Sequence, residues 1–377
     1  MNFRRTRAVA KKEFIHILRD PRSLIMALAL PFLLLLLFGY ALTLDVDRIP
    51  TLVYDMDKSP QSRELIARFG GSRYFQILGS VDHYSKIETQ IDQDVCLLGI
   101  VIPADYSENL VSGKDTEVQL LFDGSDSNTA AIALGYAHSL VEIYNHELQR
   151  EVFGRKGMTK LQTPVNAQLR VWYNSELKSR NYIVPGLIAV ILMIISALLT
   201  SLTIAREWEM GTMEQLLSTP VRAPELVLGK LVAYFSIGIT DALIAISIGV
   251  FIFKVPLRGS LLFVMVTTCI FLFGALCTGI MISAATRQQL LAYQLGIIIS
   301  FLPAFLLSGF IFAIENMPPI IQVVTHVVPT RYFIKILKGI FLKGAGIQIL
   351  WLEVALLLVY AVFVFLIATK KLKQKIA

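Results

Sequence analysis

Six long apolar stretches constrain this chain more strongly than any other feature of its sequence. A helix needs about 20 apolar residues to cross a hydrocarbon core about 30 Å thick. Of the 377 residues, 55% are hydrophobic and 17% are charged, whereas soluble domains carry about 25% charged residues. We therefore predict an α-helical polytopic membrane protein with six transmembrane helices. The predicted spans are 23–44, 182–205, 231–253, 260–286, 288–314 and 347–369.

The distribution of Lys and Arg predicts the side of the membrane on which each segment lies. Basic residues are more numerous in 1–22, 206–230 and 370–377 than in the short segments 254–259 and 315–346. Because cytoplasmic loops carry an excess of Lys and Arg, both termini are predicted to be cytoplasmic. The net charge of +7 suits the anionic lipids of that surface. Nucleic acid is not predicted as a partner, because no basic stripe is interleaved with aromatic residues.

The segment 1–22 predicts a cytoplasmic amphipathic helix that ends at Asp20-Pro21. A basic helix with one apolar face lies in the membrane interface. The alternative is an accidental periodicity within a segment that is basic only because it is cytoplasmic. The apolar face consists of Phe3, Ala10, Phe14, Ile17 and Leu18.

The long segment 45–181 has a soluble composition and predicts a small extracytoplasmic α/β domain between the first two spans. Its hydrophobic period changes between the values typical of strands and of helices. It is either a spacer or a domain for docking or substrate gating. Predicted strands are 51–54, 74–78, 96–102, 118–122 and 165–173, and predicted helices are 59–69, 82–91, 104–111 and 127–152.

Proline residues divide the region 315–343 into two helices that are too short to cross the membrane. Pro318 and Pro329 precede the segments 320–328 and 331–342. Irregular backbone at membrane depth has to be buried in protein or to line a cavity. We therefore predict a re-entrant helical hairpin before the last span.

The loop 206–225 is predicted to be cytoplasmic and yet carries Glu207, Glu209 and Glu214. If it is helical, an apolar strip runs along one side of a polar surface. Such a helix is suited to docking on a soluble partner. The alternative is a plain interfacial linker.

Asp241 lies near the middle of the third predicted span. A charge at that depth costs about 2.5–3.5 kcal/mol on insertion scales. It either lines a path for substrate or protons, or forms a hydrogen bond with Ser, Thr or Tyr in a neighbouring helix.

Motifs for catalysis and metal binding are missing from the sequence. There is no G-x-x-x-x-G-K-[ST] loop to hold ATP phosphates, no H-E-x-x-H and no C-x-x-C pair. His138 and His146 have no third ligand nearby in sequence. We predict a chain without catalytic residues, metal or bound cofactor.

Several motifs together resemble the permease subunit of bacterial type-2 ABC transporters, the ABC-2 family. The segment Arg206–Pro220 resembles the cytoplasmic signature of that family. The large insert resembles the drug-efflux-like branch. Further matching residues are Lys12-Glu13, Arg19-Asp20-Pro21-Arg22, Pro31, Phe38-Gly39, Leu307-Ser308-Gly309, Met317-Pro318 and Pro329-Thr330-Arg331-Tyr332.

This resemblance implies an exporter in the bacterial inner membrane. Related permeases are associated with drugs, lipids, polysaccharides and ions, and the apolar spans favour a drug-like or amphiphilic compound over a sugar chain. Two permeases, identical or closely related, would pair, and separate ATP-binding subunits would hold ATP and Mg²⁺. A periplasmic adaptor and an outer-membrane channel are further implied partners. Pro318, Pro329 and Arg331 would mark the re-entrant region. The helix that couples to the ATPase would contain Arg206, Glu207, Trp208, Glu209, Gly211, Thr212, Glu214, Gln215 and Leu216.

The main alternative is a membrane receptor or scaffold subunit whose extracytoplasmic domain senses a ligand. A six-span receptor normally carries a sizeable cytoplasmic output domain. The largest predicted cytoplasmic loop here, 206–230, is short. A transporter would depend on an ATPase partner, whereas a receptor or scaffold subunit would not.

The Asp241→Asn variant tests the pathway hypothesis. We expect an altered range of transported cations with little change in assembly, because only the charge of a central side chain changes. Resistance and uptake profiles across cationic compounds measure this effect, and unchanged profiles would refute the hypothesis.

Overall fold

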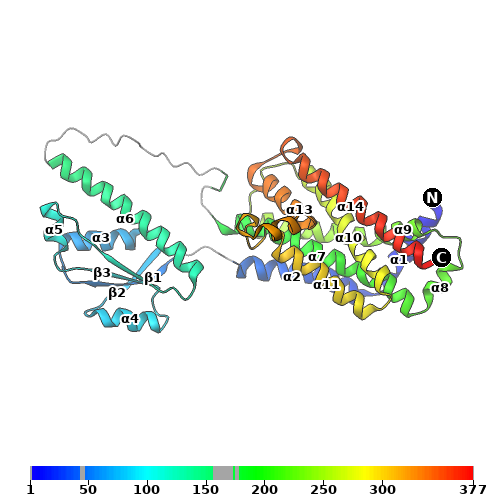
Figure 1. Ribbon diagram of the computed structural model, residues 1–377, viewed down its shortest axis with the longest axis horizontal. Helices are drawn as coiled ribbons and strands as arrows, with labels where there is room; N and C mark the ends of the chain where they lie inside the picture. Colours follow the sequence, from blue (N-terminus) through cyan, green and yellow to red (C-terminus); the bar gives the residue numbers. More distant parts are fainter. Residues whose placement is uncertain (1, 43–46, 156–172, 175–177, 377) are drawn as a thin grey trace. The chain divides into compact units, whose positions relative to one another are not determined.

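The computed structural model describes residues 2–42, 47–155, 173–174 and 178–376 (Figure 1). The chain divides into two compact units. A helical unit contains Met1–Thr43 and Arg170–Ala377, and an α/β unit contains Leu44–Leu169. Most of the strand predicted at 165–173 lies outside the described residues.

The helical unit begins with two helices that are separated by a sharp turn. The Asn2 side chain caps the first helix by accepting a hydrogen bond from the Arg4 amide at 3.1 Å, and Pro21 starts the second helix. The helices of this unit are α1 (Phe3–Arg19), α2 (Pro21–Ala41), α7 (Ser179–Glu209), α8 (Thr212–Leu217), α9 (Ala223–Ser247), η1 (Ile248–Ile252), α10 (Leu261–Thr286), α11 (Gln289–Leu306), η2 (Ile314–Asn316), α12 (Pro319–Thr325), α13 (Pro329–Lys338), η3 (Gly339–Lys343) and α14 (Ile347–Ile376).

Several of these helices have the length and hydropathy of membrane spans. Within the described residues, α7, α9 with η1, α10, α11 and α14 are long and apolar enough to cross a membrane. The pair α12 and α13, bent by 83°, would add a sixth span if counted as one. The first predicted span, α2, contains the shorter apolar helix Ala27–Ala41. The polytopic membrane fold is therefore confirmed, whereas the count of six spans stays a prediction.

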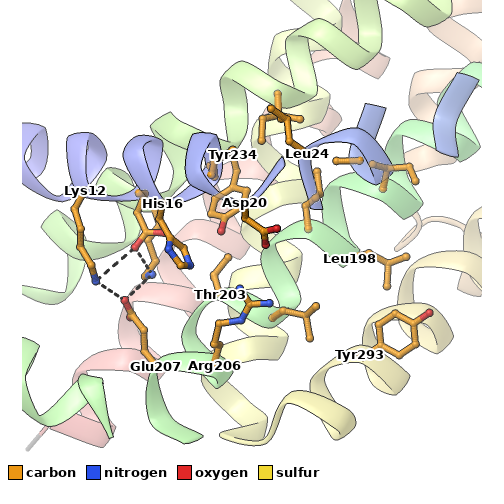
Figure 2. A pocket seen from close by; sticks show the side chains of 18 of the residues that line it. Lys12, His16, Asp20, Leu24, Leu198, Thr203, Arg206, Glu207, Tyr234 and Tyr293 are labelled. Carbon is orange, nitrogen blue, oxygen red and sulfur yellow. Dashed lines mark hydrogen bonds and ion pairs between the residues drawn. The ribbon is translucent and has the colours of Figure 1, made fainter. Parts of the chain in front are cut away.

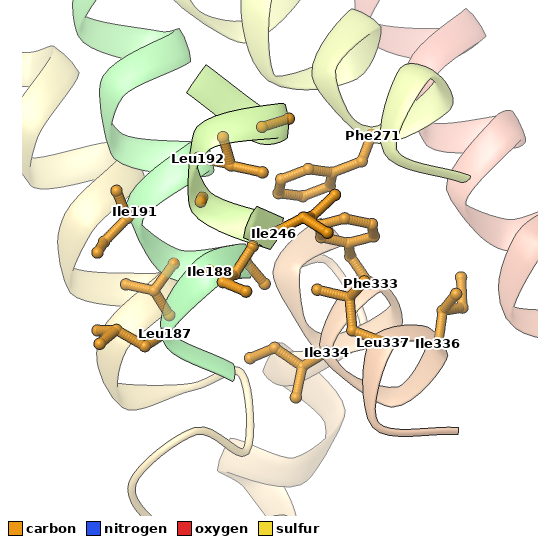
Figure 3. Close-up of a cluster of buried hydrophobic side chains, with 14 of the residues drawn as sticks. Leu187, Ile188, Ile191, Leu192, Ile246, Phe271, Phe333, Ile334, Ile336 and Leu337 are labelled. Carbon is orange, nitrogen blue, oxygen red and sulfur yellow. The ribbon is translucent and has the colours of Figure 1, made fainter. Parts of the chain in front are cut away.

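The core of the helical unit forms around α7. Its side chains are buried along most of its length, and they pack against α9, α10 and α13 (Figure 3). The rings of Phe271 and Phe333 stack with their centroids 4.1 Å apart. Gly186 of α7 admits the Phe310 ring, since an added Cβ would lie 2.6 Å from it.

Two predicted boundaries differ from the structure. The fifth predicted span, 288–314, is helical only to Leu306, because Pro303 lies in its last turn and Gly309 adopts a left-handed φ of 79°. The predicted coupling helix, 206–217, is interrupted at Gly211, whose φ is 69°. Its first part is the end of α7, and only α8 is separate.

The proline-rich region forms the two short helices that were predicted, with shifted limits. Pro329 lies in the first turn of α13 and Pro318 immediately precedes α12. A proline at these positions loses no helical hydrogen bond. The sharp bend between α12 and α13 is consistent with a re-entrant hairpin, and its place in the membrane stays a prediction.

The α/β unit contains a mixed four-stranded sheet. Its strand order is β2-β1-β3-β4, with β1 parallel to β2 and β3, and β4 antiparallel to β3. Apolar residues of α3, α5 and α6 cover one face, and Ile87 of α4 covers the other. The elements are β1 (Ile49–Asp55), α3 (Pro60–Gly71), β2 (Phe75–Ser80), α4 (Tyr84–Asp92), β3 (Leu98–Ile102), α5 (Tyr106–Ser112), β4 (Gln119–Phe122) and α6 (Ser127–Arg155).

Gly279→Ala is expected to destabilise the helical unit. The added Cβ would overlap the Thr200 hydroxyl and the Ala197 carbonyl of α7, and overpacking of this kind costs about 1–3 kcal/mol. Thermal unfolding in detergent measures the loss. Gly238→Ala is the matched control, because its Cβ would meet only Leu272 at 3.4 Å. Equal melting temperatures for the two variants would contradict the close α7–α10 packing.

Candidate functional site

The short helix α8 lies at the end of the helical unit that also holds the start of α1 and the end of α14 (Figure 1). Met213 is fully buried in a cluster with Val9 of α1 and Leu372 of α14. Glu214 and Gln215 are exposed. The helix is thus anchored by Met213, with Leu216 partly buried against the same cluster, and presents a polar surface.

Four charged side chains beside α8 form an ionic cluster, in which Glu13, Glu207 and Lys230 are buried and Lys12 is half exposed (Figure 2). The Lys230 ammonium lies 2.8 Å from Glu13 Oε1 and 3.1 Å from Glu207 Oε1. Lys12 lies 2.9 Å from the same Glu207 oxygen. Lys230 is only 1% exposed, so the cluster joins α1, α7 and α9 where little water screens its charges.

Burial makes the charges of Glu13, Glu207 and Lys230 depend on one another. Removing charges from water costs several kcal/mol each, and only close opposite charges offset that cost. Two ammonium groups face two carboxylates, so the cluster is formally neutral. Loss of one buried partner leaves an uncompensated charge and costs about 3–5 kcal/mol.

A second contact attaches α1 to the turn between α8 and α9. Glu225 accepts hydrogen bonds from the Asn2 amide at 2.6 Å and from the Arg222 amide at 3.1 Å. The Arg5 guanidinium donates to the Pro220 carbonyl and lies 3.9 Å from Glu225. The start of α1 is thereby held against the loop that carries α8.

Contacts of Arg206, Trp208 and Glu209 hold the end of α7 to the turn before α11. Glu209 Oε2 accepts from the Gln289 amide at 2.9 Å, and Arg206 Nε donates to Gln289 Oε1 at 3.4 Å. The Arg287 guanidinium stacks on the Trp208 ring, 4.4 Å from its centroid. These three side chains therefore make contacts within the chain.

The structure places Glu207 inside the bundle, and the role that the resemblance implies for it stays a prediction. It was expected, with Glu209 and Glu214, to contact an ATPase, but it is 8% exposed and bound in the ionic cluster. Thr212 instead attaches α8 to this region by donating to the Glu207 carbonyl at 3.3 Å. Glu214 and Gln215 are the predicted residues that remain accessible on α8.

Sequence reasoning missed Glu13 and Lys230 as site residues. Glu13 is the single acidic residue among the many basic ones of α1. This isolated negative charge was the feature of the sequence that could have identified it as a site residue. Lys230 was counted only as a positive charge near the membrane.

The face of α1 that packs on the bundle is different from the apolar face that was predicted to lie in the membrane interface. Thr6, Val9 and Glu13 are buried, whereas Phe14 and Leu18 are exposed. Gly229 permits this close approach, because an added Cβ would lie 2.6 Å from Val9. The exposed apolar side chains of α1 are left for the membrane interface.

Asp241 is 1% exposed. Neither of its carboxylate oxygens has a hydrogen-bond partner within the described residues. The predicted hydrogen bond with a neighbouring Ser, Thr or Tyr is therefore not observed there.

Arg331 connects the two halves of the bent pair α12 and α13. Its guanidinium donates to the Thr325 hydroxyl and to the Gln322 carbonyl, the latter at 3.4 Å. Pro318 immediately precedes α12 and Pro329 is the first residue of α13, and Arg331 joins these two helices. The three predicted residues of this region therefore belong to one local structure.

In the part of the chain that the structure describes, no group of three or more His, Cys, Asp or Glu side chains could hold a metal ion.

Lys230→Met is expected to loosen α1 from the bundle. It leaves Glu13 and Glu207 without their shared buried cation, at a cost of about 3–5 kcal/mol. Thermal unfolding and proteolysis near α1 measure the effect. Lys12→Met is the matched control, since the Lys12 side chain is half exposed and exposed pairs contribute about 0–1 kcal/mol. Equal stability of the two variants would contradict the importance of the buried cation.

The chain shares its sequence pattern with membrane transport proteins over nearly its whole length. The family described as ABC-2 family transporter protein matches residues 21–370. The probable multidrug ABC transporter permease YbhS of Escherichia coli is 35% identical over 377 residues, which is 100% of this chain and 98% of YbhS. YbhR of the same organism is 35% identical over 352 residues, 93% of each chain. ABC transporter G family member 20 of Dictyostelium discoideum is 21% identical over 379 residues, 98% of this chain and 50% of that protein. The chain therefore belongs to the ABC-2 transporter family, as a multi-pass membrane permease.

Proposed function

We propose that this chain is the permease subunit of an ATP-driven exporter in the inner membrane, with both termini cytoplasmic. ATP and Mg²⁺ would be held by a separate ATP-binding subunit, since the sequence has no phosphate-binding loop. The relatives named as multidrug permeases support a drug-like or amphiphilic substrate.

One observation carries the proposal: the exposed surface of α8 is attached directly to the ionic cluster. The α8 surface offers Glu214 and Gln215 to a soluble partner. Gly211 and Thr212 connect that surface to Glu207, which is paired with Lys230 and Lys12. A push on α8 would thus reach α1, α7 and α9 together.

This arrangement suits the transmission of an ATP-driven movement. A rigid, closely packed connection passes a displacement on, because packed elements shift as units instead of deforming continuously. Buried Met213 holds α8 against the bundle, and α7 continues from there through the core. Closure of the ATP-binding subunits would therefore tilt α7 and open the pathway to one side.

A pair of permeases would form the pathway. Helix α11 leaves a row of large apolar side chains uncovered in the single chain, which suits lipid or a second copy. Asp241, buried and without a partner in the described residues, is the candidate pathway group for cationic substrates. The exposed apolar residues of α11 are Leu290, Leu291, Leu295, Ile298, Ile299, Leu302 and Leu306.

The α/β unit is proposed to lie outside the cytoplasm. Its soluble surface and its own apolar core suit a role in meeting a periplasmic adaptor and an outer-membrane channel.

Glu214→Arg tests the docking surface. We expect the amount of ATP-binding subunit that copurifies with the tagged chain in mild detergent to fall about tenfold, the effect of 1.4 kcal/mol. The reason is that a central acidic contact would become repulsive. Mass spectrometry identifies and quantifies the partner.

Glu315→Arg is the matched control, since it makes the same charge change at an exposed position outside α8. It should leave copurification unchanged. Recovery of the ATP-binding subunit at wild-type levels with Glu214→Arg would exclude this surface. Absence of such a subunit from every sample would favour a receptor or scaffold.

A further inference from the structure

A cavity of about 430 Å³ lies inside the helical unit beside the ionic cluster (Figure 2). Its walls come from α1, α2, α7, α9 and α11, with Thr212 of α8 at one end. Small-molecule sites typically measure about 300–1,000 Å³. The cavity is therefore large enough to hold a ligand or a substantial part of one.

The cavity has a polar end and an apolar end. Arg206, Asp20 and His16 point into the polar end (Figure 2). The apolar wall is aliphatic and runs along α2 and α7. Its members include Leu24, Ala27, Leu30, Leu198, Leu199 and Leu202. A complementary ligand has a polar head and a hydrocarbon chain.

The charged side chains of the cavity lining indicate which kind of polar head group would fit. The lining contains three cationic side chains, Lys12, Arg206 and Lys230, and three carboxylates. These carboxylates belong to Glu13, Asp20 and Glu207. With no net charge, the site attracts neither a simple cation nor a simple anion over long range. A head that carries both signs matches it better.

Two atoms of the lining, Glu207 Oε2 and Arg206 Nε, have an unsatisfied or weakly satisfied hydrogen-bonding capacity, although Glu207 Oε1 is paired with Lys12 and Lys230. Glu207 Oε2 is buried without a hydrogen bond from any described residue, and a buried acceptor left unsatisfied costs about 1–3 kcal/mol or more. An ammonium group would satisfy it. Among the described residues, the Nε of Arg206 donates one long hydrogen bond of 3.4 Å, to Gln289, and the flat guanidinium is suited to a phosphate.

We propose that this cavity binds a zwitterionic membrane phospholipid of the phosphoethanolamine type. Its phosphate would lie at Arg206, its ammonium at Glu207, and one acyl chain along the aliphatic wall. The bilayer supplies this ligand, since the outer surface of α2 exposes Ile25, Leu33 and Leu37. The lipid would fill the angle between α1 and α2 and so hold α1 in place.

The test measures lipid retained by the full-length chain purified in detergent. The protein is incubated with equal amounts of phosphatidylethanolamine, phosphatidylglycerol and dodecylamine, and native mass spectrometry quantifies each bound species. Ala27→Trp and Leu199→Trp fill the cavity from opposite walls, while Leu33→Trp adds the same bulk to an exposed position of α2. Arg206→Gln tests recognition of the phosphate.

The wild-type chain and Leu33→Trp should each retain about one phosphatidylethanolamine in preference to the other two. Whichever cavity-filling variant elutes as a folded species should lose it about tenfold, and Arg206→Gln should bind it less tightly. Should neither variant fold, the Arg206→Gln result decides.

Equal retention by wild type and the tested variants would show lipid bound only around the protein and overturn the proposal. Preference for dodecylamine or phosphatidylglycerol would overturn it as well. None of these readouts needs an ATP-binding subunit, so failure here leaves the coupling proposal intact.

Discussion

The ionic cluster of Lys12, Glu13, Glu207 and Lys230 is the interaction on which one whole end of the helical unit depends. It fixes α1 against α9 and holds the last turn of α7 in the same place. Because opposite charges in a poorly screened site must stay together, these helices cannot separate independently. The surface of α8 is attached to them through Gly211 and Thr212. A force applied there therefore acts on three helices, which is the requirement for a coupling device.

Close packing at glycine extends this rigidity along the bundle. Gly229 brings α9 against α1, and Gly279 brings α10 against α7. Small residues allow helix backbones to approach closely, which is the main source of association between helices in lipid. The long buried helix α7 then connects the ionic cluster with the aromatic core around Phe271 and Phe333.

Comparison of particular predicted elements with the structure shows which features the sequence predicted correctly. The apolar stretches predicted the membrane class, and the alternating periods predicted α3, α4 and α5 within a few residues. The predicted helix limits were less accurate where a glycine or proline ends a helix. This is the case at Gly211 and after Leu306. The face of α1 that packs on the bundle could not be predicted from hydrophobicity alone. Its polar residue Glu13 is buried by its partner Lys230, which lies far away in the sequence.

The sequence by itself determined the class of the protein, since a run of about 20 apolar residues has few alternatives to a membrane helix. It also determined the family, because the motif at Arg206–Pro220 is contiguous. The tertiary structure decided which members of that motif face outward. Glu207 and Glu214 have the same chemistry and lie in the same short segment, yet one is paired inside the bundle and the other is exposed. The physical reason is that burial of a charge depends on whether a distant opposite charge can reach it, and only folding brings α1, α7 and α9 together.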